Sequence, residues 1–352
     1  MRQIRAAEPN AVDPIIILGA PRSGTTWLAK IFDSHPDVLY LHEPDTVLRT
    51  SALPVICRRS DIARYRPVAY EYVQQLITTQ TLKTVGSLPI FAKTYRSRAA
   101  HCARTAIIFA VHAFGQITRR ANAGARVAIP EMADRAVDRP VRTVIKSVTL
   151  RGSAGVFAAA LPHSHFVFIV RHPCGQIASW ARGFTTGRFL TKLTLKKSLI
   201  EEILATDGAE QHRLDSVCLH TMSEIELLAW HWGLFNQKVV DDVADGARLH
   251  VVSYERLCER PIETARNLFD AVGLAWDRRA VSFIGKSTTY HGPYRYYGVR
   301  QNTQAVKEKW RHELDTGDQL RIMAIAQRFP IGRFICDAEE WGRDPTQVMK
   351  VG

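Results

Sequence analysis

The sequence predicts an α/β fold, a three-layer sandwich in which helices cover both faces of a central, mostly parallel five-stranded sheet. Three observations favour this class. Five short β-branched or aliphatic runs are bounded by turn-forming or polar residues, helical stretches separate them, and a glycine-containing loop follows the first run directly. Runs of this kind are typical of strands buried on both faces, and their alternation with helices is typical of a parallel sheet.

The expected strands occur in order along the chain as Ile15–Leu18, Val38–Leu41, Val141–Ile145, His165–Val170 and Leu249–Val252. Proline marks the limits of several helices between them, because it fits the first helical turn and cannot continue a helix. The expected helices are Thr25–Ser34, Cys174–Arg182, Ile225–Val243 and Ile262–Val272. Two stretches, 51–139 and 182–221, are expected to be mostly helical insertions into a single domain over residues 10–345.

Lysine and arginine number 47 against 34 aspartate and glutamate residues, and the formal net charge is +13. A basic balance favours anionic partners such as nucleotides, acidic substrates, nucleic acid or an anionic membrane surface. A basic protein without such a partner is the alternative that composition leaves open. With 352 residues, 46% of them hydrophobic, the chain can bury a large core.

Six scattered cysteines show no C-x-x-C spacing, so the sequence indicates neither a zinc site nor a redox motif. Reduced thiols are therefore expected. The N-terminal residues lack the apolar core of a signal peptide. No run approaches the ~20 apolar residues of a membrane span; Ala106–Phe114 is apolar, but it is short and contains His112. These features predict a cytoplasmic protein without a transmembrane segment.

The first strand leads into the loop Gly19-Ala20-Pro21-Arg22-Ser23-Gly24-Thr25-Thr26-Trp27. Loop amides and a helix N-terminus together form an anion site. Gly19, Gly24 and Thr26 fit the Walker pattern of a P-loop, but Thr25 stands where the lysine belongs, and the cation is Arg22 instead. The pattern predicts a P-loop NTPase-like fold with an unusual phosphate site. An ordinary glycine turn before a helix is the alternative.

The segment PRSGTTW resembles the 5′-phosphosulfate loop of sulfotransferases that use 3′-phosphoadenosine-5′-phosphosulfate (PAPS). An arginine at the position of Arg22 is typical of Golgi and many bacterial members, whereas cytosolic members carry lysine. The resemblance implies that Arg22, Ser23, Gly24, Thr25 and Thr26 hold the 5′-phosphosulfate. It also implies that Trp27 lies near the adenine, although packing in the core is an alternative for this residue.

A second motif follows the fourth strand, where Arg171 leaves the strand and Ser179 lies in the next helix. A guanidinium and a hydroxyl in this arrangement can bind one phosphate, and arginine contacts phosphate with two parallel hydrogen bonds. The spacing resembles the 3′-phosphate element of the same family. His172 stands where aspartate is commoner, which leaves the two binding residues intact.

Two further segments resemble the family less specifically. Tyr254, just after the fifth strand, matches a tyrosine that approaches the adenine; a buried tyrosine capping the sheet is the alternative. The segment 306–311 resembles the closing segment, in which a basic residue for the 3′-phosphate precedes a tryptophan. Arg295 and Arg300 both qualify for that role.

Sulfuryl transfer needs a base for the acceptor's proton and cations for the charge on the leaving phosphate. Arg22 can stabilise that charge. Lys146, at the end of the third strand, is the candidate for contacting the bridging oxygen, unless it is a solvated surface lysine. Cytosolic sulfotransferases carry a catalytic histidine two residues further on, but Val148 occupies that position. Relatives with an acidic base imply Glu43, with His42 as second candidate; a glutamate that caps a turn is the alternative.

The resemblance thus implies sulfuryl transfer from PAPS to a hydroxyl or amine, with adenosine 3′,5′-bisphosphate as product and no metal. A small-molecule, carbohydrate or glycolipid acceptor is expected, and no nucleic acid. The acceptor's identity and the oligomeric state stay open. A P-loop kinase or hydrolase, a nucleotide- or RNA-binding module, and a non-catalytic relative are the alternatives. A kinase would need the missing loop lysine and a Mg²⁺-binding aspartate at a strand end.

Overall fold

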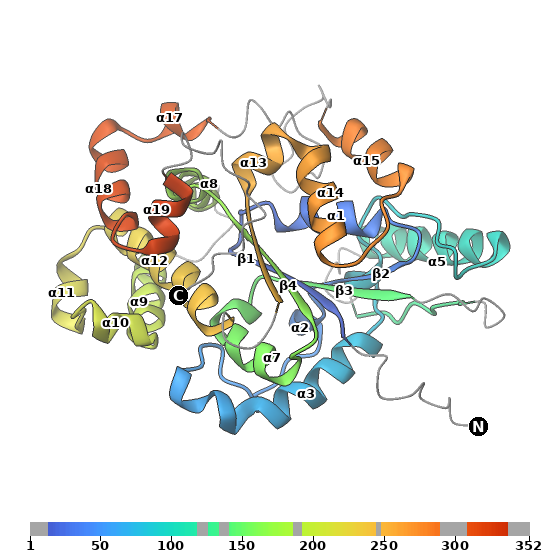
Figure 1. Ribbon diagram of the computed structural model, residues 1–352, viewed down its shortest axis with the longest axis horizontal. Coiled ribbons are helices and arrows are strands. Elements are labelled where there is room, and N and C mark those ends of the chain that lie inside the picture. The colour runs from blue at the N-terminus through green and yellow to red at the C-terminus, as the bar shows by residue number, and fades with distance from the viewer. Residues whose placement is uncertain are drawn as a thin grey trace.

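The computed structural model describes residues 13–117, 126–133, 141–185, 192–243, 248–288 and 308–336. They contain a five-stranded sheet with the strand order β2-β3-β1-β4-β5, and every pairing is parallel (Figure 1). The strands are β1 (Ile15–Gly19), β2 (Val38–His42), β3 (Arg142–Ser147), β4 (His165–Val170) and β5 (Arg248–Ser253). The five predicted strands are confirmed, and β3 alone extends two residues past its predicted end.

Strand β1 occupies the centre of the sheet and pairs with β3 on one side and β4 on the other. Ile17 lies opposite Lys146 of β3 and Val167 of β4. The carboxyl ends of these three strands therefore meet at one edge, which is where ligands bind in open parallel sheets. The loop after β1 and the residues that end β3 and β4 share this edge.

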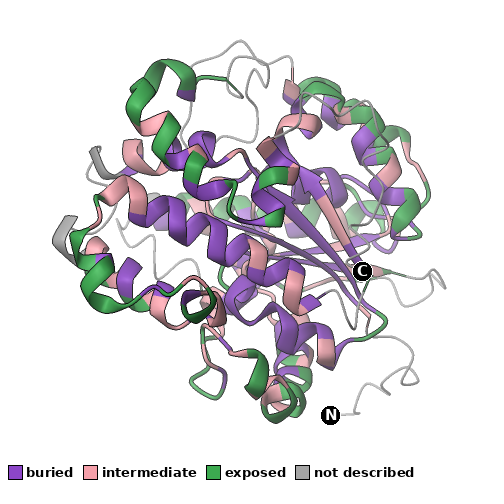
Figure 2. Cartoon of the chain, turned by 60° about the vertical axis from the view of Figure 1, so that its left-hand side comes forward, coloured by how far each residue is buried: buried purple, intermediate pink, exposed green. Residues whose placement is uncertain are grey.

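Alternate residues of β1 face opposite sides of the sheet. Ile15 and Ile17 join one buried cluster with α1 (Thr25–Asp33), α13 (Tyr254–Glu259), α14 (Pro261–Ala271) and α15 (Arg278–Thr288). Ile16 and Leu18 join a larger cluster on the other side, and Figure 2 shows the strands buried between helices whose outward faces are exposed. The three-layer sandwich is confirmed.

The larger cluster is covered by helices from several parts of the chain. They are α3 (Ile62–Thr78), α7 (Ala154–Ala160), α8 (Pro173–Thr185), α9 (Lys192–Leu204), α10 (Asp207–Gln211), α11 (Ser216–Thr221), α12 (Glu224–Val243), α17 (Trp310–Glu313), α18 (Thr316–Ala326) and α19 (Pro330–Cys336). Short 3₁₀ turns occur at Arg59–Asp61 and Leu150–Ser153. The four helices expected from sequence are α1, α8, α12 and α14; α14 begins on Pro261 itself.

The stretch 51–139 contains α3, α4 (Leu82–Val85) and α5 (Arg98–Ile117), and the shorter α2 (Pro44–Val47) precedes it. A small separate core of Leu82, Ile108 and Ile129 attaches α5 to the rest of this stretch. The stretch 182–221 contains α9, α10 and α11, so both stretches contain helices as expected. The extent of a single domain over residues 10–345 stays a prediction. Among the described residues, no helix is long and apolar enough to cross a membrane.

A buried ion cluster fixes the end of α1. The Asp33 carboxylate accepts hydrogen bonds from Lys30 Nζ at 2.7 Å and from Lys93 Nζ at 2.9 Å. Lys30 Nζ also donates to the carbonyl of Pro89 at 3.0 Å. Burial works to raise the pKa of Asp33, but the two ammonium groups outweigh it and leave that pKa lowered. The cluster ties the helix behind the β1 loop to the segment 87–93.

We predict that Asp33→Asn destabilises the fold by about 3 kcal/mol, because it leaves two buried ammonium groups without a counter-charge. Urea unfolding followed by circular dichroism measures this change. Glu201→Gln is the control, since Glu201 pairs with Lys197 at the surface and its removal is expected to cost below about 0.5 kcal/mol. Equal shifts of the two unfolding midpoints would contradict the assigned role of Asp33.

Candidate active site

The loop between β1 and α1 turns through two residues with positive φ, Arg22 at 72° and Gly24 at 90°. The Ser23 hydroxyl closes the turn by donating to the carbonyl of Ala20 at 2.7 Å. A Cβ atom on Gly24 would lie 2.3 Å from the ring of Tyr254. Glycine is therefore required at Gly24 by both its backbone conformation and its contact with Tyr254.

The two predicted phosphate elements contact each other at this edge. Arg22 Nε donates to the Ser179 hydroxyl at 3.2 Å, and Arg171 Nη1 donates to the carbonyl of Arg22 at 3.1 Å. The Arg171 guanidinium also lies over the ring of Tyr254, 4.7 Å from its centroid. Four residues predicted from separate motifs thus form one cationic edge, a donor set suited to phosphate groups.

Two indole groups support the same edge from the helical side. Trp180 Nε1 on α8 donates to the carbonyl of Pro21 at 3.2 Å, and Trp232 Nε1 on α12 donates to the carbonyl of Arg171 at 3.1 Å. Each indole holds a backbone carbonyl next to one of the arginines. Sequence reasoning missed Trp232, because its helix shows only the amphipathic pattern of a core element.

His172 packs flat on Trp310, with ring centroids 4.5 Å apart and an interplanar angle of 10°. Its backbone amide donates to the Glu255 carboxylate at 3.1 Å. Burial raises the pKa of Glu255, although Arg171 opposes the shift. Trp310 of the predicted closing segment therefore lies beside the Arg171 element. Arg295 and Arg300 lie outside the described residues.

Glu43 and Lys146 form a close ion pair between the ends of β2 and β3. Lys146 is only 2% exposed, so it is not a solvated surface lysine. Burial lowers the pKa of Lys146 even though Glu43 favours its charged form. Burial also works to raise the pKa of Glu43, but Lys146 outweighs it and leaves that pKa lowered. Lys83 of α4 approaches the other carboxylate oxygen at 4.0 Å.

Glu43 is the residue before α2, yet its side chain forms no capping hydrogen bond. Its backbone has a φ of 47°, in the left-handed region that costs a non-glycine residue roughly 1–2 kcal/mol. Arg22 and Glu43 are two of the four non-glycine residues with positive φ among those described. Strained backbone concentrates at functional sites, so this observation points to both residues.

His42 is held by a 2.8 Å hydrogen bond between its Nδ1 and the Tyr40 hydroxyl. Burial and the nearby Lys146 lower the pKa of His42 to about 3. The imidazole is therefore neutral at physiological pH, and it directly precedes Glu43 in the chain.

Sequence reasoning also missed Asp45, two residues beyond Glu43. Its Oδ2 accepts hydrogen bonds from the hydroxyls of Ser147, at 2.9 Å, and Thr149. Its buried Oδ1 has no hydrogen-bond partner. Burial raises the pKa of this carboxyl. The sequence signal is a second acid two positions after the predicted base.

Trp27 is 7% exposed, and its Nε1 donates to the Ser287 hydroxyl on α15 at 3.0 Å. It packs within the cluster on the α1 side of the sheet, as the core alternative predicted. Thr25 and Thr26 begin α1 directly after the loop, where the helix amides point toward the same edge.

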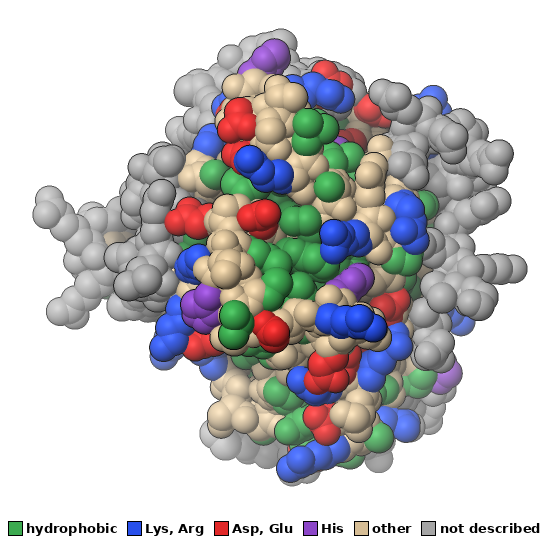
Figure 3. All heavy atoms as spheres, turned by 90° about the vertical axis from the view of Figure 1, so that its left-hand side faces the viewer, with side chains coloured by type: hydrophobic (Ala, Val, Ile, Leu, Met, Phe, Trp, Pro, Cys, Tyr) green, Lys and Arg blue, Asp and Glu red, His purple; other side chains and the backbone are tan. Residues whose placement is uncertain are grey.

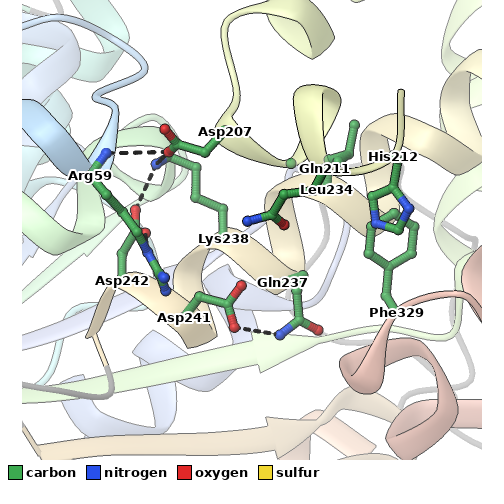
Figure 4. A pocket seen from close by; sticks show the side chains of 11 residues that line it. Arg59, Asp207, Gln211, His212, Leu234, Gln237, Lys238, Asp241, Asp242 and Phe329 are labelled. Carbon is green, nitrogen blue, oxygen red and sulfur yellow. Dashed lines mark hydrogen bonds and ion pairs between the residues drawn. The ribbon is translucent and has the colours of Figure 1, made fainter. Parts of the chain in front are cut away.

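Figure 3 shows the face formed by α9–α11 and α18, where apolar side chains gather in a hollow ringed by charged groups. A pocket between α10, α12 and Phe329 contains several charges that pair with each other (Figure 4). Lys238 Nζ lies 2.7 Å from the Asp242 carboxylate, which Arg59 Nε also contacts at 3.0 Å. None of the predicted site residues lines this pocket, so the β1 edge is the better candidate.

A family model described as the sulfotransferase family matches residues 14–278, more than half of the chain. No curated protein matches the chain in sequence.

Three solved structures resemble it in outline. The sulfotransferase domain from the curacin biosynthetic pathway is 15% identical, with 90% of this chain and 97% of that chain covered and a TM-score of 0.44. The sulfotransferase domain of the Synechococcus PCC 7002 olefin synthase is 16% identical, with coverages of 93% and 98% and a TM-score of 0.38. A sulfotransferase from Alicyclobacillus acidocaldarius is 14% identical, with coverages of 89% and 96% and a TM-score of 0.37. Identities this low and TM-scores below 0.5 leave family membership to the family match alone.

We predict that Gly24→Ala destabilises the protein by at least about 2 kcal/mol, through its positive φ and the clash with Tyr254. The combined change with Tyr254→Ala is expected to cost less than the sum of the two single changes, by about 1 kcal/mol or more. Urea unfolding of all four forms measures this coupling. Gly115→Ala in α5 is the control, since nothing lies within 4 Å of its added Cβ. Strict additivity would show that Tyr254 does not restrict Gly24.

Proposed function

Since this chain belongs to the sulfotransferase family, we propose that it transfers a sulfuryl group from PAPS to a hydroxyl or amine of a small-molecule, carbohydrate or glycolipid acceptor. The observation that carries this proposal is the convergence of Arg22, Ser179 and Arg171 at one edge of the sheet. Two cationic elements joined in this way suit a ligand with phosphate groups at two separate positions. PAPS is such a ligand and ATP is not.

The donor's two ends would be held by different elements. Arg22, Ser23, Gly24, Thr25 and Thr26 would hold the 5′-phosphosulfate through loop amides, hydroxyls and one guanidinium. In support, the loop has the left-handed turn that brings successive amides together, and α1 begins on Thr25.

Arg171 and Ser179 would hold the 3′-phosphate, with the outlying Arg295 or Arg300 as a further cation. Trp27 and Tyr254 would lie toward the adenine. Tyr254 is buried between Gly24 and Arg171, so in the resting protein it also positions both phosphate elements.

In the reaction the acceptor oxygen forms a bond to sulfur while the bond from sulfur to the phosphate oxygen breaks. The acceptor's proton goes to the Glu43 carboxylate, and adenosine 3′,5′-bisphosphate leaves with the bonding electron pair. Lys146 and Arg22 would stabilise the charge that grows on the leaving oxygen. Glu43 suits the role of base because Lys146 keeps it ionised, and its side chain is not used to cap a helix. Neutral His42 is the second candidate for the base.

We predict that the protein binds adenosine 3′,5′-bisphosphate more tightly than ATP with Mg²⁺, and that Arg171→Ala weakens bisphosphate binding at least about 100-fold. Loss of a charge-assisted phosphate contact is expected to cost about 3 kcal/mol. The bisphosphate affinity of Arg171→Lys should lie between those of the wild type and Arg171→Ala, because lysine keeps the charge but not the planar guanidinium. Isothermal titration calorimetry measures all three proteins.

Arg66→Ala, which removes one exposed positive charge from α3, is the control and should bind like the wild type. A preference for ATP with Mg²⁺, or equal affinity of Arg171→Ala and the wild type for the bisphosphate, would contradict the proposed donor.

We predict that kcat/KM stays constant on acidification until the pH falls below 4.5, the ordinary pKa of glutamate, because the pKa of Glu43 is lowered. The base acts in its deprotonated form, so activity is lost only below its pKa. Lys146→Gln removes the charge that holds this pKa down, so the acid limb of the residual activity should move to higher pH.

The measurement is the rate at limiting acceptor across pH, with bisphosphate binding at each pH as the control for folding. Glu43→Gln should lower kcat at least about 100-fold while bisphosphate affinity is retained. An acid limb well above 4.5 would contradict Glu43 as the base, and so would near wild-type turnover of Glu43→Gln. Because the pKa of His42 is lowered to about 3, only the second result would make His42 the base.

A further inference from the structure

From Cys102 to Phe114, every exposed residue of the helix α5 has an apolar side chain. Phe109 is 52% exposed and Phe114 is 65% exposed. Small apolar residues fill the space between them, at spacings of three and four residues that place them on one side of the helix. This outer face consists of Cys102, Ala103, Ala106, Phe109, Ala110, Ala113 and Phe114.

The opposite side of α5 is fixed to the protein, so the direction of the outer face is settled. Ile108 is fully buried against Leu82 and Ile129. Arg104 is buried beside Glu131, and His112 Nε2 hydrogen-bonds the carbonyl of Gly86 at 3.0 Å. Figure 1 shows α5 at the edge of the molecule, away from the central sheet. A planar surface can therefore approach the helix from outside.

The outer face belongs to a part of the chain with one sign of charge. Residues 98–130 contain five arginines and no aspartate or glutamate. Of these, Arg98 and Arg126 are exposed, whereas Arg104 is used in its ion pair with Glu131. An apolar face in basic surroundings is typical of segments that lie at an anionic membrane surface.

A second copy of the chain fits this face less well. Two-fold pairing through α5 would bring the same arginines of both copies together, with no acidic residue in 98–130 to offset them. The total charge of +13 adds to that repulsion. A bilayer containing anionic lipid supplies the opposite charge and accepts the two phenylalanine rings in its headgroup region.

We propose that the outer face of α5 docks the protein on an anionic lipid surface, with Phe109 and Phe114 inserted and nearby arginines contacting the headgroups. The docking is peripheral, because α5 is anchored to the protein along its opposite side. It does not depend on the proposed chemistry, since neither the phosphate elements nor Glu43 is part of α5.

The test is co-sedimentation of the full chain with vesicles of phosphatidylcholine alone and with vesicles that also contain phosphatidylglycerol. Binding is expected only to the second kind, and it should weaken between about 0.1 M and about 1 M salt, where screening becomes severe. The double variant Phe109→Ser, Phe114→Ser should lower the partition coefficient at least about tenfold. Val217→Ser, Leu320→Ser is the control, since it removes two apolar side chains outside α5 that are more exposed than the two phenylalanines, and it should bind like the wild type.

The two exposed cysteines report the orientation. A polarity-sensitive dye on Cys102 of the outer face, in a Cys218→Ser protein, should shift to the blue on anionic vesicles. The same dye on Cys218 of α11, in a Cys102→Ser protein, should not shift.

Equal vesicle binding by the two double variants would overturn the proposal, because it would show that net charge alone accounts for the binding. If the dye on Cys102 shifted to the blue with rising protein concentration in the absence of lipid, the proposal would also be overturned, in favour of self-association. Calorimetry with the bisphosphate needs no vesicles, so failure of the proposed function would be seen separately.

Discussion

One hydrogen bond organises the candidate site: the Arg171 guanidinium donates to the backbone carbonyl of Arg22. It connects the end of β4 to the loop after β1, and the two cations then lie at one edge although 149 positions separate them in the chain. Two neighbouring guanidinium groups repel each other, so the arrangement needs supports that do not depend on charge. The indoles of Trp180 and Trp232 and the ring of Tyr254 provide them, by binding carbonyls and by packing on Gly24.

The second half of the site is built on an ion pair. Glu43 and Lys146 come from neighbouring strands, and each compensates for the burial of the other. Removing either charge would leave a buried ion without a partner, which is costly. The pair thus keeps a proton acceptor and a cation charged in a place that would otherwise favour their neutral forms. Asp45, which accepts hydrogen bonds from two hydroxyls, adds a buried carboxyl group next to this pair.

The sheet could be predicted almost completely, because strands buried on both faces leave continuous apolar runs, as in Ile15–Leu18 and His165–Val170. The site residues could be predicted where they follow such strands, since the carboxyl ends of parallel strands meet at one edge. Contacts between distant segments could not be predicted. Lys93 and Asp33 are 60 positions apart, and Trp232 is 61 positions from Arg171. No periodicity or spacing in the sequence records such pairings, and the strained backbone of Glu43 leaves no sequence signal either.

The helix α1 is held at both of its ends. Its first residues continue the loop of Arg22 and Gly24, and its last turn is locked by the buried cluster of Lys30, Asp33 and Lys93. Any adjustment to a ligand at this edge must therefore be absorbed in the few residues before Thr25, where the backbone is already strained. In hydrogen-exchange terms, we expect α1 to open more slowly than the loop before it. A rigid helix behind a small adjustable turn makes ligand binding selective, because the site cannot accommodate a ligand of the wrong shape by moving α1.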